Sequence, residues 1–388
     1  MLHNDAENTR TTCANVDPHL ASQMATHLAQ HGRPDDFYVV RELAARPVFQ
    51  PTITSRRRLH HINPAILAQR PVLVVVAEKP MHADRLAQMF AARWPGHQLF
   101  FVLTYTFGLS KLALPAPNPL ATYPHVADPV WQFRSTFPSA PVWAPHGEDV
   151  VPTDLPVEFI LATADEIILA CEADSTGAVA SHTLLQECLS ADAARQLRRV
   201  VALTALDEQH IEEAYSAGLT TLDPEYQGWL STGLARRFFE FNYNANALAA
   251  QGPVLARLGL KAPQQVVSKH ALQLLYHLRR EARAPLTEAS LLQLMATGFD
   301  VEGLPRTPLG SVLSRMAIID ALLVAGLIEK DSRDFHRVTR LGQEFLSALP
   351  TKCEDPALPA KLSVWCANWP ESRGAMVAYL QEFFSPAA

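Results

Sequence analysis

The feature that most constrains the fold is the apolar run PVLVVVA at residues 71–77. A continuous run of this kind is typical of a strand that is covered on both faces. A helical pattern follows in ADRLAQMFAARW (83–94), and a second helix is predicted at about 178–189. Further apolar runs lie at 100–105, 157–162, 165–170 and 199–204. Strands that alternate with helices in this way predict an α/β domain over residues 69–204, with a mainly parallel sheet flanked by helices.

The regions around these runs have a different composition. Residues 1–68 are polar, contain several prolines and show no sustained period, which predicts a loosely ordered N-terminal extension. Its SRRRLHH segment (55–61) is typical of a solvated charge run, with a DNA-contacting arm as the alternative. The proline-rich span 114–156 is expected to be a long insertion that leaves and rejoins the sheet.

Residues 205–388 predict a mostly helical domain. Apolar residues follow helical spacing at 271–278 and at 312–323. The stretch 326–349 then predicts a short strand, a polar turn, a second strand and a helix. That order after a helix predicts a winged-helix part at about 265–350, a kind of module that either binds DNA or serves as a packing and protein contact.

Charge is unevenly distributed along the chain. The 388 residues carry a formal net charge of −6, which excludes a uniformly basic coat for nucleic acid. Residues 71–189 contain 12 acidic and 5 basic residues, whereas residues 190–345 contain 17 of each. The first region therefore needs a metal ion or a few well-placed cations to contact phosphate. The second region can form basic patches by clustering.

The ends and the cysteines predict a cytoplasmic protein without a membrane partner. The N-terminal MLHNDAENTR lacks an apolar signal core, and the longest apolar stretches are much shorter than a membrane span. The five cysteines contain no CxxC pair, so neither a disulfide framework nor a zinc ribbon is expected.

Two acidic motifs directly follow predicted strands. AEKP (77–80) follows VLVVV, and CEAD (171–174) follows EIILA. Because ligands bind outside the carboxyl ends of parallel strands, Glu78, Glu172 and Asp174 are expected to converge on one site. Carboxylates of this kind suit Mg²⁺, which takes one or two of them and leaves the rest of its shell to water and phosphate. For either motif alone, solvated acids at a strand end are the alternative.

These motifs resemble the Toprim domain of type IA DNA topoisomerases, whose second motif has the pattern DxDxE. Later stretches follow the segments of that family in order: DPVWQFRSTFPSAP, LTALDEQHIEEAYSAG, GLARRFFEFNYNAN, PLTEASLLQLM, GLPRTPLGSVLSRMAIIDALLVAGLIEK, TRLGQEFLSALP and DPALPAKLSVW. The resemblance covers roughly residues 70–385. It implies a Toprim domain, followed by the helical DNA-groove domain with its winged-helix part, and Mg²⁺ as the cofactor.

The chain departs from the family where the chemistry takes place. Glu172 stands for the first Asp of the acidic motif and Asp174 is retained, but Thr176 replaces the Glu. Only 37 residues (249–285) occupy the place of the family's arch and Tyr-bearing domains, which is too short for two domains. Tyr276 is expected to pack in the core. The sequence therefore offers no nucleophile, and Glu78 is the one catalytic candidate.

The resemblance assigns a phosphate-binding role to Arg236, because its helix lines the single-strand groove of the family. DNA-binding residues are accordingly predicted at Lys79, Arg236, Arg237, Lys269, Arg279 and Arg280. Aromatic faces beside cations hold unpaired bases in many such proteins. Of the aromatic residues beside Arg236, namely Phe238, Phe239, Phe241 and Tyr243, one is expected to be exposed for this purpose.

We therefore expect a type IA topoisomerase-like protein that binds single-stranded or junction DNA and performs no strand passage alone. One alternative is a Toprim nuclease that uses Mg²⁺ held by Glu78, Glu172 and Asp174 for nicking. The other is a scaffold whose protein partner supplies the missing Tyr domain.

Overall fold

The structure is a computed structural model of the whole chain and describes residues 60–109, 124–133, 141–259, 268–282 and 284–385. The predicted N-terminal extension lies outside the described residues except for 60–68. The chain forms two compact units. The sheet unit consists of Pro47–Leu109 and Val130–Leu234, and the helical unit of Met1–Arg46, Ser110–Pro129 and Ala235–Ala388.

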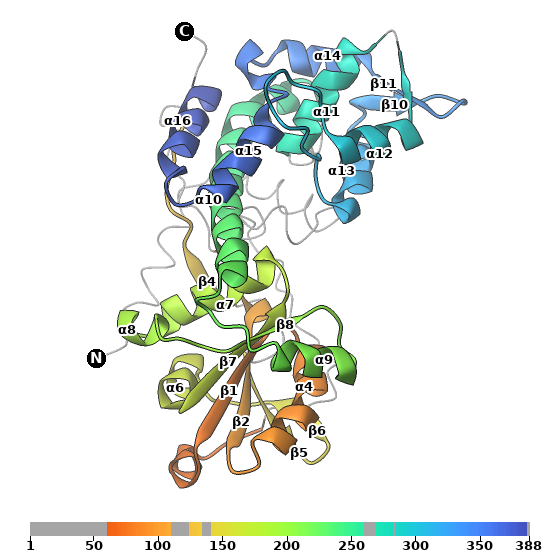
Figure 1. Cartoon of the computed structure of the whole chain (residues 1–388). Coiled ribbons are helices and arrows are strands. Elements are labelled where there is room, and N and C mark those ends of the chain that lie inside the picture. The colour runs from red at the N-terminus through yellow and green to blue at the C-terminus, as the bar shows by residue number, and fades with distance from the viewer. Residues whose placement is uncertain (1–59, 110–123, 134–140, 260–267, 283, 386–388) are drawn as a thin grey trace. The chain divides into compact units, whose positions relative to one another are not determined.

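The sheet unit is built on six strands in the order β6-β5-β2-β1-β7-β8 (Figure 1). Four of them run parallel: β2 (Gln98–Leu103), β1 (Val72–Ala77), β7 (Glu166–Glu172) and β8 (Val200–Leu203). β5 (Val142–His146) and β6 (Asp149–Pro152) add an antiparallel edge. The predicted α/β architecture with a mainly parallel sheet is confirmed.

Both faces of this sheet are covered, which explains why the run at 71–77 is apolar throughout. Alternate residues of β1 point into two cores: Val72, Val74 and Val76 into one, Leu73, Val75 and Ala77 into the other. The second core is closed by α4 (Pro80–Arg93) and α9 (Glu208–Ser216). The first is closed by α6 (Val157–Thr163), α7 (Ser175–Cys188) and the first residues of α10 (Pro224–Arg257). Shorter elements are η2 (Pro64–Gln69), η3 (Thr104–Thr106), β3 (Phe107–Leu109), β4 (Trp131–Phe133) and α8 (Ala191–Ala194).

One predicted strand is a helix, and one insertion is partly sheet. The run VEFILA (157–162) forms most of α6, where Val157, Ile160 and Leu161 are buried at helical spacing. A short apolar run fits either structure, and both sides of β1 are already paired with β2 and β7. The proline-rich span 114–156 contributes β5 and β6 to the sheet, so it rejoins earlier than predicted.

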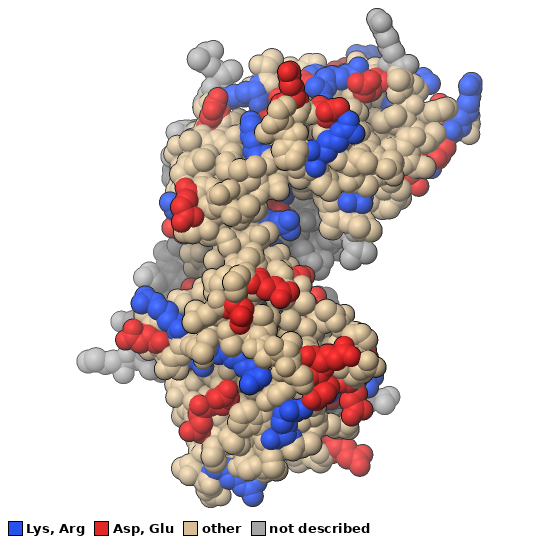
Figure 2. Space-filling view, in the orientation of Figure 1, with Lys and Arg blue, Asp and Glu red and all other residues tan. Residues whose placement is uncertain are grey.

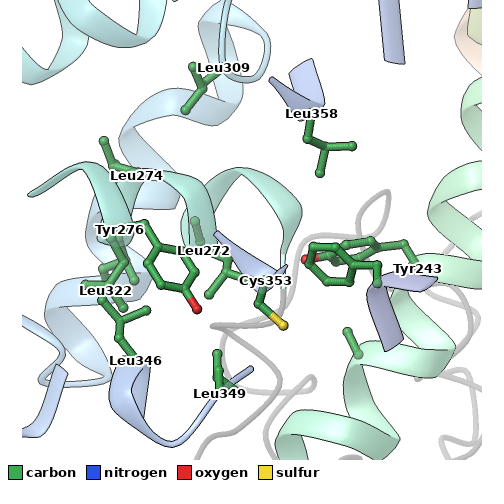
Figure 3. Close-up of a cluster of buried hydrophobic side chains, with 14 of the residues drawn as sticks. Tyr243, Leu272, Leu274, Tyr276, Leu309, Leu322, Leu346, Leu349, Cys353 and Leu358 are labelled. Atoms are coloured by element: carbon green, nitrogen blue, oxygen red, sulfur yellow. The ribbon is translucent and has the colours of Figure 1, made fainter. Parts of the chain in front are cut away.

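The helical unit contains most of α10 and the elements that follow it. They are α11 (Lys269–Arg280), β9 (Leu286–Thr287), α12 (Glu288–Thr297), α13 (Val312–Val324), β10 (Ile328–Lys330), β11 (Phe335–Val338), α14 (Arg340–Ser347), η5 (Thr351–Cys353), α15 (Leu358–Ala367) and α16 (Arg373–Phe384). The strands pair antiparallel in the order β10-β11-β9. The helices share one apolar core, part of which Figure 3 shows around Leu272, Leu322 and Leu346.

Two asparagines of α10 hold an extended segment of the same unit. Asn246 accepts a hydrogen bond from the backbone N–H of His125 at 2.7 Å and donates one to its carbonyl at 2.7 Å. Asn242 does the same with Ala127 at 2.8 and 2.9 Å. Both asparagine side chains are fully buried. They satisfy backbone groups that the segment would otherwise bury without partners.

Within the described residues, we find no helix with the length and apolar character needed to cross a membrane.

Candidate functional site

The carboxyl ends of β1 and β7 form the first candidate site. The two strands are parallel neighbours, with Ala77 opposite Ala170, so Glu78 and Glu172 leave the sheet at the same edge. The side chain of Lys79 lies between them. Its Nζ is 2.8 Å from Oε1 of Glu78 and 3.2 Å from Oε1 of Glu172. The structure thus brings together two of the three predicted metal ligands, with an ammonium group between them.

The third predicted ligand, Asp174, has a different role. It is the N-cap of α7, and its Oδ1 accepts hydrogen bonds from the backbone N–H groups of Thr176 and Gly177, each at 2.8 Å. Gly177 is needed beside this cap, because a Cβ there would lie 2.6 Å from the carbonyl oxygen of Glu172. Asp174 therefore stabilises the start of α7.

The edge does not fit the predicted Mg²⁺. Oε2 of Glu78 is buried and has no hydrogen-bond partner, which leaves one acceptor free. However, the Lys79 ammonium contacts the facing oxygens of both glutamates. Burial is the main cause that raises the pKa of Glu78, and the nearby Glu172 charge adds to it. In the part of the chain that the structure describes, no three His, Cys, Asp or Glu side chains are arranged to hold a metal ion.

The charge state of Lys79 follows from the same contacts. Burial lowers the pKa of Lys79, but its hydrogen bonds and charge contacts with Glu78 and Glu172 outweigh burial and raise the pKa. The side chain is an ammonium ion at neutral pH. It is an ion-pair partner inside the unit, and a phosphate would have to compete with two carboxylates for it.

His82 belongs to this edge although the sequence did not single it out. Its side chain is 4% exposed, its Nε2 is 3.9 Å from Oε1 of Glu172, and its Nδ1 has no partner. Burial, followed by the Lys79 charge, lowers the pKa of His82, so the ring is neutral at pH 7. The signal available in the sequence was a histidine close behind the AEKP motif.

Tyr105 also lies at this edge, because its backbone N–H donates to the Glu78 carbonyl at 3.0 Å. Its side chain packs against the core that α4 covers, and burial raises the pKa of its phenol. This environment favours a neutral phenol over a nucleophilic phenolate.

The second candidate site is a cationic cluster in the helical unit. Lys269, at the start of α11, lies 2.7 Å from Oε1 of Glu240 on α10. The charge of Arg237 lowers the pKa of the same carboxylate, and the Arg236 side chain contacts the Cys366 thiol. Burial raises the pKa of Glu240, but the charges of Lys269 and Arg237 outweigh it and lower the pKa to about 2. Lys269 and Arg237 thus act on the Glu240 carboxylate, and Arg236 lies beside the Cys366 thiol, which the charges of Lys269 and Glu240 also affect.

The remaining predicted DNA contacts are engaged within the helical unit. Arg279 and Arg280 pair with the two oxygens of Glu354 at 3.0 and 3.3 Å. Two further cations, on the β10–β11 hairpin, were not among the predicted contacts and are also paired: Lys330 with Glu288 and Asp334, and Arg337 with Asp331 at 3.7 Å. Each of these cations has a carboxylate partner that would compete with a phosphate.

The predicted aromatic platform is wrong. Phe238, Phe239, Phe241 and Tyr243 are all at most 2% exposed and belong to the interior. The apolar faces of this long helix are needed for packing against α11, α15 and α16, as the shared core shows. Tyr276 is buried as predicted, 2% exposed, and Figure 3 shows its hydroxyl group among core side chains.

The acidic character of the sheet unit is visible at its surface. In Figure 2, acidic side chains gather over α9, whose sequence with its N-cap includes Asp207, Glu208, Glu212 and Glu213. Such a surface repels a phosphate backbone.

No protein-family model and no curated protein matches this chain.

Proposed function

We propose that the helical unit binds a single strand of nucleic acid, with DNA as the expected ligand, through the cluster of Arg236, Arg237 and Lys269. The observation that carries the proposal is the group of three cations from two helices, in which Lys269 and Arg237 act on Glu240 and Arg236 lies with Lys269 beside Cys366. Arg236 is exposed, and none of the ion pairs found among the described residues includes it. Cations arranged in this way bind phosphates without sequence preference.

The order of elements supports the same proposal. α11, β9, α12, α13, β10 and β11 follow one another as in a winged-helix module, and the strands pair as β10-β11-β9. The exposed face of α13 carries Val312, Met316, Asp320 and Val324, which is an apolar and acidic face. For this reason we assign phosphate contact to α10 and α11, and not to α13.

The resemblance to type IA topoisomerases extends the proposal. We infer a truncated protein of this type, which holds a strand of nucleic acid without breaking it. Four of the described tyrosines offer no activated nucleophile in support of cleavage, since Tyr226, Tyr243 and Tyr276 are buried and Tyr379 donates to Asp355 at 2.9 Å. The nicking alternative is weakened because Lys79 lies between Glu78 and Glu172. Supercoiled plasmid with Mg²⁺ or Mn²⁺ is expected to stay uncut and unrelaxed.

Fluorescence anisotropy with single-stranded, forked and duplex DNA tests the binding. Wild-type protein is expected to bind the single-stranded and forked forms more tightly than duplex. Arg236→Ala should weaken binding several-fold, whereas Arg306→Ala, a matched exposed cation paired with Asp300, should leave it unchanged. Equal loss in both variants, or no loss in Arg236→Ala, contradicts the assignment to the cluster. Co-purification from the native cell tests the scaffold alternative separately.

A further inference from the structure

The charge arrangement at the edge of β1 and β7 leads to an inference that does not depend on DNA binding. Two carboxylates of neighbouring strands point at one position, and a single positively charged nitrogen fills it. The Lys79 Nζ lies 2.8 Å from one oxygen and 3.2 Å from the other. An ion that bridges two carboxylates would have to occupy the same place.

We propose that the Lys79 ammonium is the resident cation of this edge, and that it takes the place of a divalent metal ion. The carboxylate pair is then a latent metal site, closed by the lysine that follows Glu78 in the chain. Removal of the ammonium group opens a site for a hard divalent cation such as Mn²⁺ or Mg²⁺.

One further side chain, His82, and the second oxygen of the Glu78 carboxylate lie beside this position. His82 is more than nine-tenths buried, has an unpartnered Nδ1 and faces Oε1 of Glu172 with its Nε2 at 3.9 Å. Oε2 of Glu78 is buried without a hydrogen-bond partner. A buried polar atom without a partner is costly, so its presence beside an ion pair indicates a site with unused coordination capacity.

The lysine and a metal ion exclude each other for electrostatic reasons. A divalent cation at the midpoint would lie within a few ångströms of the ammonium, and the repulsion would cancel much of the attraction from the two carboxylates. With the ammonium in place, the formal charge of the three groups is −1, compared with −2 for the two carboxylates alone. Without it, the carboxylates of Glu78 and Glu172 stand unpaired, and oxygen ligands of this kind suit Mn²⁺ or Mg²⁺.

Titration of the full chain with Mn²⁺, followed by the electron paramagnetic resonance signal of the free ion, tests the proposal. Wild-type protein and Lys79→Arg, which keeps the positive charge, are expected to show no saturable binding at millimolar Mn²⁺. Lys79→Met should bind one ion per chain at least tenfold more tightly. Adding Glu172→Gln to Lys79→Met should abolish that gain. Circular dichroism and a thermal melt establish that the variants are folded.

Tight stoichiometric binding by the wild type that Glu172→Gln removes would overturn the proposal, as would equal affinity of Lys79→Met and wild type. If Lys79→Met does not fold, the wild type still decides the question. In a nuclear magnetic resonance spectrum of protein with ¹⁵N-labelled lysine side chains, the Lys79 signal is assigned as the one that is missing from the spectrum of Lys79→Arg. Millimolar Mn²⁺ should broaden it no more than the signal of Lys361, which pairs with Asp355 in the helical unit. Selective loss of the Lys79 signal contradicts the inference.

Discussion

At the scale of single residues, the acidic motif CEAD divides into two roles. Glu172 faces Lys79, whereas Asp174 caps α7 through two backbone N–H groups. The DxDxE-like spacing alone suggests that both carboxylates serve one ion. The structure instead uses Asp174 for the helix that follows, because the first N–H groups of a helix have no partner within it.

Substitution of Asp174 separates capping from metal binding. Asp174→Ala is expected to lower the free energy of unfolding by about 1 kcal/mol, whereas Asp174→Asn, which still caps, should cost much less. Urea unfolding of both variants measures this. Equal losses would show that the negative charge, and not the cap, is what the protein needs.

The charged cluster around Glu240 predicts sensitivity to acid. Burial, followed by the charge of Lys269, lowers the pKa of His270 to about 3 in the folded chain. In the unfolded chain, the His270 ring takes up a proton near its ordinary pKa of about 6.5. The free energy of unfolding therefore has its full contribution from neutral His270 above about pH 6.5, and this contribution is lost as the pH falls towards 3. Glu240, with its lowered pKa of about 2, adds a loss between its ordinary pKa near 4.5 and about 2.

Urea unfolding at a series of pH values from 7.5 to 4.5 checks this prediction. Each such group contributes up to about 1.4 kcal/mol per pH unit. His270→Gln should decline less steeply than wild type between pH 6.5 and 4.5, and His146→Gln, at an exposed strand end, should follow the wild type. Parallel curves for His270→Gln and wild type would contradict the assigned role.

At the scale of elements, two of the glycines of α10, Gly233 and Gly228, lie in opposite environments. Gly233 lies against α7: a Cβ there would be 2.5 Å from the Ser175 carbonyl oxygen and 2.4 Å from a Val179 methyl group. Gly228, five residues earlier in the same helix, has no heavy atom within 4 Å of the corresponding position. Of these two positions, close packing requires glycine at 233 and not at 228.

The two sites give a matched pair of substitutions. Gly233→Ala should lower the free energy of unfolding by about 1–3 kcal/mol, because the added methyl group overpacks the contact and moves α7 or α10. Gly228→Ala should stabilise by roughly 0.5–1 kcal/mol through helix propensity. Thermal and urea unfolding measure both changes. Stabilisation by both would mean that α10 does not approach α7 as closely as the structure has it.

At the scale of the whole molecule, the proposed binding of a nucleic-acid strand would be a local property of an acidic protein. The formal net charge is −6, and the acidic surface over α9 opposes a phosphate backbone. Within the residues that the structure describes, we expect affinity for nucleic acid to come from a small number of cations. A small number of contacts predicts a shallow dependence of affinity on salt.

The slope of log affinity against log salt concentration measures the number of these contacts. Each phosphate that Arg236 or Arg237 neutralises on a single strand contributes about 0.7 to the slope. Arg236→Ala/Arg237→Ala should therefore reduce the slope by roughly 1.4. A slope that does not change would place the contacts elsewhere. Lys269 is unsuitable for this test, because its removal leaves Glu240 without its closest partner.

The sequence by itself determined β1, β2, β7 and β8, since runs covered on both faces are apolar throughout. It also determined that Glu78 and Glu172 leave the sheet at one edge, because parallel neighbours end together. It misassigned 157–162, since a short apolar run has no period long enough to separate strand from helix.

Only the tertiary structure decided what the charged and aromatic residues do. The Lys79 ammonium between two glutamates, Asp174 at the start of α7 and Arg279 with Arg280 on Glu354 are contacts between atoms, and spacing along the chain does not report them. The four aromatic side chains beside Arg236 were likewise assigned by packing. A cation next to an aromatic residue has the same sequence whether the helix turns that residue to solvent or into the core. The neighbouring helices settle that choice.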